Sequence, residues 1–406
     1  MTTMVRSASA RVHPPILRGL AEHLLDRVPE LTERLHAVLL AKDETYRTTD
    51  LIAPEELTRS LRDNLTRCMQ FLADRVPRGE DFRDAARRTA EQRARAGFPM
   101  ESLLHAYRIG TEVLWAALVE EARAHCPESI GELLDSAVDV MELTDMMSQA
   151  AGAEYRAQEA AAIRRNAERR QALLDGLLTG RGADPDPAAE ASRVLELPAD
   201  GRFAVAVVRH DTPSASPPWS PRDALAAHRF RSEWCLRSGQ EVGLVLLGDA
   251  PVQRLATQLR KTVEGRAGVS AAVVGLAEVA SAYRMAELAS DTVPPERPEV
   301  VAFEERLPEV LLAANPAIAQ QIRRRAFGAL LELDEDRRTV LLDTLTSWFR
   351  HDGSAAKVGA ELHCHRNTVL HRLARIEELT GRSLPDDRDG LLLRLALLAT
   401  SSTTPT

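Results

Sequence analysis

The sequence predicts a protein of several domains that is mainly α-helical and contains one central α/β domain. Its 406 residues correspond to two to four domains at about 100–200 residues per domain. Apolar residues recur at helical spacing in the first part of the chain and again near its end, whereas short runs of small and β-branched apolar residues between them are typical of buried strands. We therefore expect an all-α N-terminal domain, a central α/β domain and a helical C-terminal domain. Their expected ranges are 1–165, 166–305 and 306–400.

The N-terminal domain is expected to be helical throughout. Leu17, Leu20 and Leu24 recur at helical spacing, and a further helix is expected from about Met100 to Cys126-Pro127. The proline-free stretch from Ile130 to Leu178 predicts a helix or a helix pair that leads out of this domain. Apolar residues along it follow a 3-4 spacing, which fits a seam between two chains and equally fits a helix packed on its own domain. These residues are Leu143, Met146, Ala150, Ala153, Ala157 and Ala160.

The central domain is expected to alternate strands with helices after a linker at Gly180–Ala188, whose composition is rich in glycine and proline. This alternation is typical of an α/β domain. The expected strands are Phe203–Val208, Glu241–Leu247, Gly268–Val274 and Val300–Phe303. The expected helices are Val252–Val263 and Glu278–Ala289.

Within the C-terminal domain, the segment 354–381 predicts two short helices separated by a tight break. The first helix ends at His363-Cys364, and the second begins near His365 or Arg366. The apolar stripe expected on the first helix consists of Ala355, Ala356, Val358 and Leu362. The residues expected to be buried on the second are Val369, Leu370, Leu373, Ile376 and Leu379. The residues expected on its polar face are Thr368, His371, Arg372 and Arg375.

A helix with one buried and one polar, partly cationic face is what recognition of the DNA major groove requires. Arg366, Asn367 and Thr368 would enter the groove first, where backbone N–H groups of the helix N-terminus also favour phosphate. The segment from Asp352 to Arg382 has five basic and four acidic residues, a balance of +1 in a chain of net charge −8. Any amphipathic helix pair shows the same periodicity, so periodicity alone leaves a purely structural role open.

The residues of this segment resemble the C-terminal helix-turn-helix domain of the PucR/CdaR family of bacterial transcriptional regulators. A run L-x-x-T-L-x-x-W-F ends at Phe349, the core H-R-N-T-V stands at His365–Val369, and R-L-x-x-I-x-x-x-T-G falls on Arg372–Gly381. The resemblance covers about 60 residues and implies sequence-specific binding to an operator in double-stranded DNA. The DNA contacts it implies are Arg366, Asn367, Thr368 and Arg372, with His371 and Arg375 as secondary contacts.

The central domain resembles the degenerate GGDEF domain that members of this family carry. Where a working diguanylate cyclase has Gly-Gly-Asp-Glu-Phe at a hairpin, this chain has Ser238-Gly239-Gln240-Glu241-Val242. Only one carboxylate, that of Glu241, is left to hold the metal ions on which phosphoryl transfer relies. We therefore expect no enzymatic activity and no cofactor. The N-terminal domain resembles the sensor-like domain of RsbR-type stress regulators, and an unknown small-molecule effector there stays open.

Other features of the sequence bear on localisation, on disulfides and metal sites, and on the oligomeric state. No apolar run is long enough to span a bilayer and the N-terminus has no apolar signal region, so a cytoplasmic protein without a membrane partner is expected. The four cysteines lie far apart, and His363-Cys364-His365 has no second ligand cluster, so neither a disulfide framework nor a metal site is expected. The weak local charge predicts that the chain binds DNA as a homodimer or higher homo-oligomer. Two alternatives remain, a protein-interaction adaptor in stress signalling and a nucleotide cyclase.

Overall fold

The computed structural model describes residues 12–209, 221–295 and 297–401. By its internal contacts the chain divides into two compact units, residues 1–166 and 167–406, and each is described by itself.

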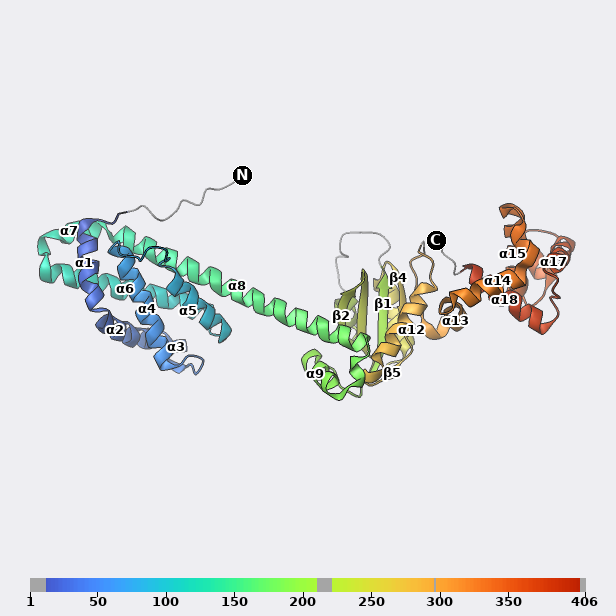
Figure 1. The fold of residues 1–406 in the computed structure, drawn as a ribbon, viewed down its shortest axis with the longest axis horizontal. Coiled ribbons are helices and arrows are strands. Elements are labelled where there is room, and N and C mark those ends of the chain that lie inside the picture. The colour runs from blue at the N-terminus through green and yellow to red at the C-terminus, as the bar shows by residue number, and fades with distance from the viewer. Residues whose placement is uncertain (1–11, 210–220, 296, 402–406) are drawn as a thin grey trace. The chain divides into compact units, whose positions relative to one another are not determined.

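The first unit is entirely helical in its described residues, as the sequence predicts (Figure 1). The predicted helix pair after residue 130 is confirmed, because the chain breaks at Ser136 between α7 and α8. Leucine residues from most of the helices form one continuous apolar core. The helices are α1 (Pro15–Asp26), α2 (Val28–Lys42), α3 (Glu44–Thr48), α4 (Pro54–Leu72), α5 (Asp84–Arg95), α6 (Met100–His125), α7 (Ile130–Asp135) and α8 (Ala137–Leu178).

The 3-4 pattern along α8 divides into two parts. Leu143 is buried in the core of the N-terminal domain, together with Met147 and Ala151. Ala153, Ala157 and Ala160, which continue the pattern, are exposed. The beginning of the pattern therefore packs on its own domain, whereas the later alanines leave a small-residue stripe uncovered in this chain.

The second unit begins with a six-stranded sheet in the order β2-β3-β1-β4-β6, with β5 also paired to β1. All pairs are antiparallel except β4 with β6. Ser238 and Gly239 connect β2 to β3 in a hairpin, with positive φ at both residues. The strands are β1 (Arg202–Arg209), β2 (Arg231–Arg237), β3 (Gln240–Leu246), β4 (Arg266–Val269), β5 (Val273–Val274) and β6 (Val300–Ala302).

Both faces of this sheet are covered by helices, which explains why β1 is an uninterrupted apolar run. Phe203, Val205 and Val207 face one core, formed with the end of α8 and with α9 and α12. The alternate residues of β1 face a second core, formed with α10 and α11. The helices are α9 (Pro185–Leu195), α10 (Pro221–Ala227), α11 (Val252–Thr262) and α12 (Val279–Asp291).

Three details of this domain differ from the prediction. The expected linker at 180–188 contains the start of α9, because Pro185 and Pro187 fall in its first turn, where a missing N–H costs nothing. The expected strand 268–274 is split into β4 and β5. Between them the backbone N–H of Val205 donates to the Ser270 hydroxyl at 2.9 Å, where a regular ladder would have a backbone carbonyl. Strand β2 was not predicted, because its charged residues hide the alternation of an edge strand.

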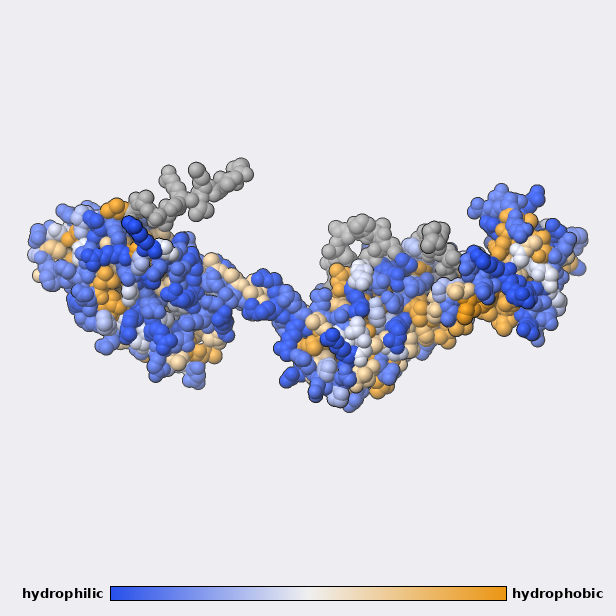
Figure 2. Space-filling model, viewed as in Figure 1, coloured by the Kyte–Doolittle hydropathy of each residue, from blue (hydrophilic) through white to orange (hydrophobic). Residues whose placement is uncertain are grey.

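The C-terminal part of the second unit is helical, and its core includes Phe327, Leu345, Val369, Ile376 and Leu393. No helix in the described ranges is long and apolar enough to cross a membrane. The visible surface is mainly hydrophilic with scattered apolar areas (Figure 2). The helices of this part are α13 (Leu307–Ala313), α14 (Pro316–Phe327), α15 (Glu335–Arg350), α16 (Ala355–Glu361), α17 (Arg366–Thr380) and α18 (Asp387–Ser401).

Candidate nucleic-acid interface

Helices α16 and α17 form a helix-turn-helix with a very tight turn. The backbone N–H of Cys364 donates to the carbonyl of Gly359 at 2.9 Å, and His363 takes the left-handed conformation with φ of 50°. A Cβ atom on Gly359 would lie only 2.7 Å from the carbonyl oxygen of Cys364. Glycine is therefore required where α16 passes the turn, and this close approach fixes the position at which α17 begins.

Helix α17 is held by a narrow buried stripe. Val369 and Ile376 are fully buried and Leu373 nearly so, and all three pack in the C-terminal core. Leu370 was expected to be buried but is 45% exposed, because it lies about 100° round the helix from Val369 and so outside the stripe. Leu379 is half-buried, as an edge residue of the same core.

Helix α16 contributes less to the core than the sequence predicts. Val358 is buried, and Ala355 and Leu362 pack beside it. Ala356, which the predicted stripe included, is exposed. Because a helix of seven residues makes only two turns, only a few of its side chains can face the core.

The N-terminus of α17 is exposed and capped. The side chain of His365 accepts a hydrogen bond from the backbone N–H of Asn367 through Nδ1 at 3.3 Å. Arg366, Asn367 and Thr368 are all exposed in the first turn. The structure thus brings these three predicted residues together at the positive end of the helix dipole, where negative groups are favoured.

The other three predicted residues lie further along α17 and differ in exposure and in their hydrogen-bond or ion-pair partners. His371 is exposed. Arg375 is exposed and pairs with Glu378 at 2.5 Å, a surface ion pair that costs little to break. Arg372 is half-buried, and its Nη1 donates to the Thr344 hydroxyl of α15 at 3.3 Å. Arg372 therefore lies at the border between the core and the exposed face of α17, and part of its guanidinium is bonded within the domain.

A connection that the sequence did not predict joins α16 to α15. The carboxylate of Glu361 accepts hydrogen bonds from Ser347 and Arg350, and His351 Nε2 lies 2.9 Å from it. These bonds, that of Ser347 first, lower the pKa of Glu361 below its ordinary value. Ten or more residues separate Glu361 from its partners, so no local sequence pattern pointed to this contact.

Three protein-family models match consecutive parts of the chain. The model of the RsbT co-antagonist protein RsbRD N-terminal domain matches residues 29–170. The GGDEF-like domain model matches residues 179–292. The model of the PucR C-terminal helix-turn-helix domain matches residues 341–399, which contain α16 and α17.

Curated relatives match over shorter stretches. The carbohydrate diacid regulator of Escherichia coli is 45% identical over 62 residues, 15% of this chain and 16% of that protein. The purine catabolism regulatory protein of Bacillus subtilis is 32% identical over 91 residues, 22% of this chain and 17% of that protein. The uncharacterized protein YsfB of Bacillus subtilis is 32% identical over 97 residues, 23% of this chain and 25% of that protein. The matches thus span at most a quarter of these relatives' length.

The agreement of the three models along the chain, and of the helix-turn-helix geometry with the model that covers it, identifies the domains. An RsbRD-type N-terminal domain precedes a GGDEF-like domain, and a PucR-type helix-turn-helix domain follows them. The chain therefore carries a PucR-type helix-turn-helix domain in its C-terminal part.

Proposed function

We propose that this chain is a sequence-specific DNA-binding transcriptional regulator whose helix α17 reads the major groove. One observation carries the proposal. Helix α17 is fixed by a buried stripe and by a tight turn, while the residues of its capped first turn remain exposed. A rigid helix that presents exposed donors at its N-terminus is the arrangement that base readout in the major groove requires. Two of the relatives, the carbohydrate diacid regulator and the purine catabolism regulatory protein, are regulators by name, which agrees with this proposal.

Within this proposal the exposed residues of α17 have separate roles. Arg366 and Asn367 reach base edges, since arginine pairs with guanine and asparagine with adenine through two hydrogen bonds each. Thr368, His371 and Arg375 contact phosphates or bases at the edge of the groove. Arg372 holds α17 against α15 through Thr344 and adds positive charge beside the groove. Leu370 follows Arg366 by one helical turn, and its exposed side chain suits contact with a thymine methyl group.

The remaining parts of the chain supply signal input and assembly. A +1 recognition segment in an acidic chain attracts DNA weakly, so we propose a homodimer or higher homo-oligomer that places two recognition helices in successive major grooves. The exposed alanines of α8 suit a contact between copies. We also propose that the protein acts in the cytoplasm and is not an enzyme, since Glu241 is the one carboxylate of the Ser238–Val242 hairpin.

The test is a selection of genomic DNA fragments by the full-length protein at moderate salt. Enrichment of one shared sequence with two half-sites is the expected result, because each protomer of a dimer contributes one recognition helix. Half-site centres should lie about 10 base pairs, or a multiple of this, apart. Failure to enrich any sequence would contradict the proposal and favour the adaptor alternative.

A further inference from the structure

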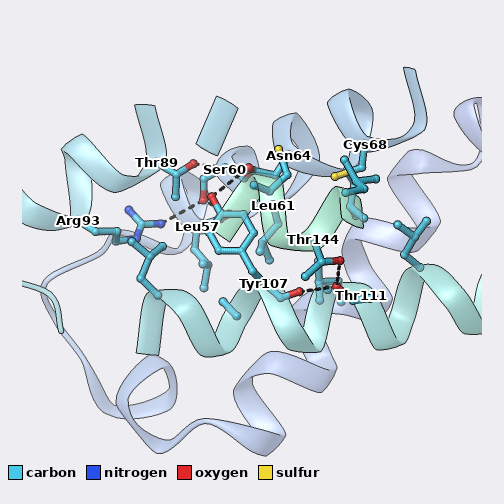
Figure 3. Close-up of a pocket in the computed structure, with 18 of the residues that line it drawn as sticks. Leu57, Ser60, Leu61, Asn64, Cys68, Thr89, Arg93, Tyr107, Thr111 and Thr144 are labelled. Atoms are coloured by element: carbon cyan, nitrogen blue, oxygen red, sulfur yellow. Dashed lines mark hydrogen bonds between the residues drawn. The ribbon is translucent and has the colours of Figure 1, made fainter. Parts of the chain in front are cut away.

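The core of the N-terminal domain contains a cavity between α2, α3, α4, α5, α6 and α8. The space open to the centre of a water-sized sphere is about 60 Å³. Figure 3 shows residues that line it, with one polar group around Arg93, Ser60 and Thr89 and a separate polar pair of Thr111 and Thr144. The rest of the lining is mainly apolar and includes Leu35, Leu57, Leu61, Leu114, Leu143 and Met147.

The polar end of the cavity is formed around a buried guanidinium. Arg93 of α5 is only 1% exposed. Its Nη1 donates to Glu56 Oε1 at 2.8 Å, and its Nη2 donates to the Ser60 hydroxyl at 3.1 Å. Its Nε has no hydrogen-bond partner among the described residues. A buried N–H of a charged group costs free energy when it has no hydrogen-bond acceptor. A ligand that supplies an acceptor to Nε would remove this cost.

The neighbouring polar groups are already satisfied by one another. The Asn64 amide donates to the Ser60 carbonyl and to the Thr89 hydroxyl, and the Tyr107 hydroxyl donates to Asn64 Oδ1 at 3.2 Å. Thr111 and Thr144 share a hydrogen bond of 2.5 Å (Figure 3). Of the buried side-chain nitrogen and oxygen atoms that line the cavity in the described ranges, Arg93 Nε alone lacks a partner.

Burial keeps the two tyrosines of the cavity protonated. It raises the pKa of Tyr46 to about 12, although the charge of Arg93 and a hydrogen bond with the Arg93 guanidinium act in the opposite direction. It also raises the pKa of the Tyr107 phenol. Neither tyrosine therefore supplies an anion to the guanidinium at neutral pH.

The charge of Arg93 is balanced by Glu56, and this decides the kind of ligand. A carboxylate ligand would bring a second negative charge into a site that is already neutral, and burying an uncompensated charge is expensive. An uncharged acceptor needs no such compensation. It still gains a charge-assisted hydrogen bond from Nε, which is stronger than a bond between neutral groups.

We propose that this cavity binds a small, uncharged carbonyl compound whose oxygen accepts from Arg93 Nε and whose apolar body contacts the leucines. A water molecule needs about 10–15 Å³ of such space. The cavity therefore accommodates on the order of four to six non-hydrogen groups, the size of a short amide, ketone or lactone. The role of this ligand as the signal of the regulator rests on the function proposed above, whereas its binding does not.

The experiment is a titration of the full-length protein, without DNA, with cyclopentanone as the probe, followed by ligand-observed NMR. We expect saturable binding, and weaker binding of cyclopentane, which has the same ring but no acceptor. Butyramide should bind more tightly than butanoate, which carries the charge that the site disfavours. Equal affinity for cyclopentanone and cyclopentane, tighter binding of butanoate, or no binding of cyclopentanone would each overturn the proposal, the last because the cavity would then hold water only.

Variants locate the binding in this cavity. Arg93→Met should raise the Kd for cyclopentanone about tenfold to a hundredfold, the effect of losing a hydrogen bond to a charged group. Arg95→Met is the matched control, since Arg95 lies two residues away on α5, is exposed and pairs only at the surface with Glu91. Ala106→Leu adds side-chain volume to the cavity lining while Arg93 itself is kept, so it should also weaken binding. Unchanged affinity in both Arg93→Met and Ala106→Leu would contradict this location.

The experiments distinguish failure of the cavity-ligand proposal from failure of the proposed regulator function. A protein that selects a DNA sequence but does not bind cyclopentanone refutes only the cavity ligand. A protein that binds cyclopentanone through Arg93 but selects no DNA refutes only the regulator.

Discussion

At the scale of single residues, the three arginines of α17 have different surroundings and therefore different expected roles. Arg366 projects from the first turn and is exposed. Arg372 is half-buried and bonded to Thr344, so part of its effect on DNA binding acts through the position of α17. Arg375 must give up its surface pair with Glu378 before it can contact a phosphate.

Glu361 gives a prediction about pH. Its pKa is lowered in the folded state, so the stability it contributes is present above the ordinary carboxyl pKa and is lost as the pH falls through the lowered value. Acidification from pH 7 towards pH 3 should therefore loosen the contact between α15 and α16. Hydrogen exchange measured on peptides of these two helices should report this loss of protection.

The control for this prediction is Glu361→Gln. Its amide cannot titrate, so the variant should begin with less protection at pH 7 and change less on acidification than the wild type. If the two proteins show the same pH dependence, Glu361 is not the group that links the helices.

At the scale of elements, the turn between α16 and α17 depends on Gly359. In an open helical position, replacing glycine with alanine stabilises a helix by about 1 kcal/mol. At Gly359 the added Cβ meets the Cys364 carbonyl oxygen at 2.7 Å, so the turn must shift. We expect Gly359→Ala to destabilise the helix-turn-helix by about 1–3 kcal/mol, the usual cost of overpacking, as read from hydrogen exchange of α16 and α17.

The matched control is Gly19→Ala in α1, where nothing lies within 4 Å of the added Cβ. This variant should be neutral or more stable, because only helix propensity acts there. A stabilised Gly359→Ala would show that the close approach at the turn does not constrain the domain.

The same elements show how far sequence reasoning reaches. The start of α17 and the stripe of Val369, Leu373 and Ile376 could be predicted because helical periodicity is local. Strand β2 could not, since an edge strand needs no continuous apolar run. The contacts of Glu361 and Arg372 with α15 join residues that are distant in sequence, and no periodic pattern encodes them.

At the scale of the whole molecule, three domains follow one another along the chain. The N-terminal domain contains the cavity with the unpartnered Arg93 Nε in its described residues, the GGDEF-like domain follows, and the helix-turn-helix completes the chain. In the function proposed here, the assembled chain recognises a particular DNA sequence through α17. Phosphate contacts alone would bind any sequence and would weaken uniformly with salt.

The most direct test is a fluorescence anisotropy titration of the selected DNA site with full-length wild type, Arg366→Ala and Arg337→Ala. Arg337 is an exposed arginine of the same domain outside α17, so its variant removes the same charge elsewhere. We expect Arg366→Ala to lose about 1–3 kcal/mol of binding free energy and to tolerate changes at one base pair of the site. We expect a smaller loss and an unaltered sequence preference for Arg337→Ala. Equal losses in the two variants, with sequence preference intact in both, would contradict base readout by α17.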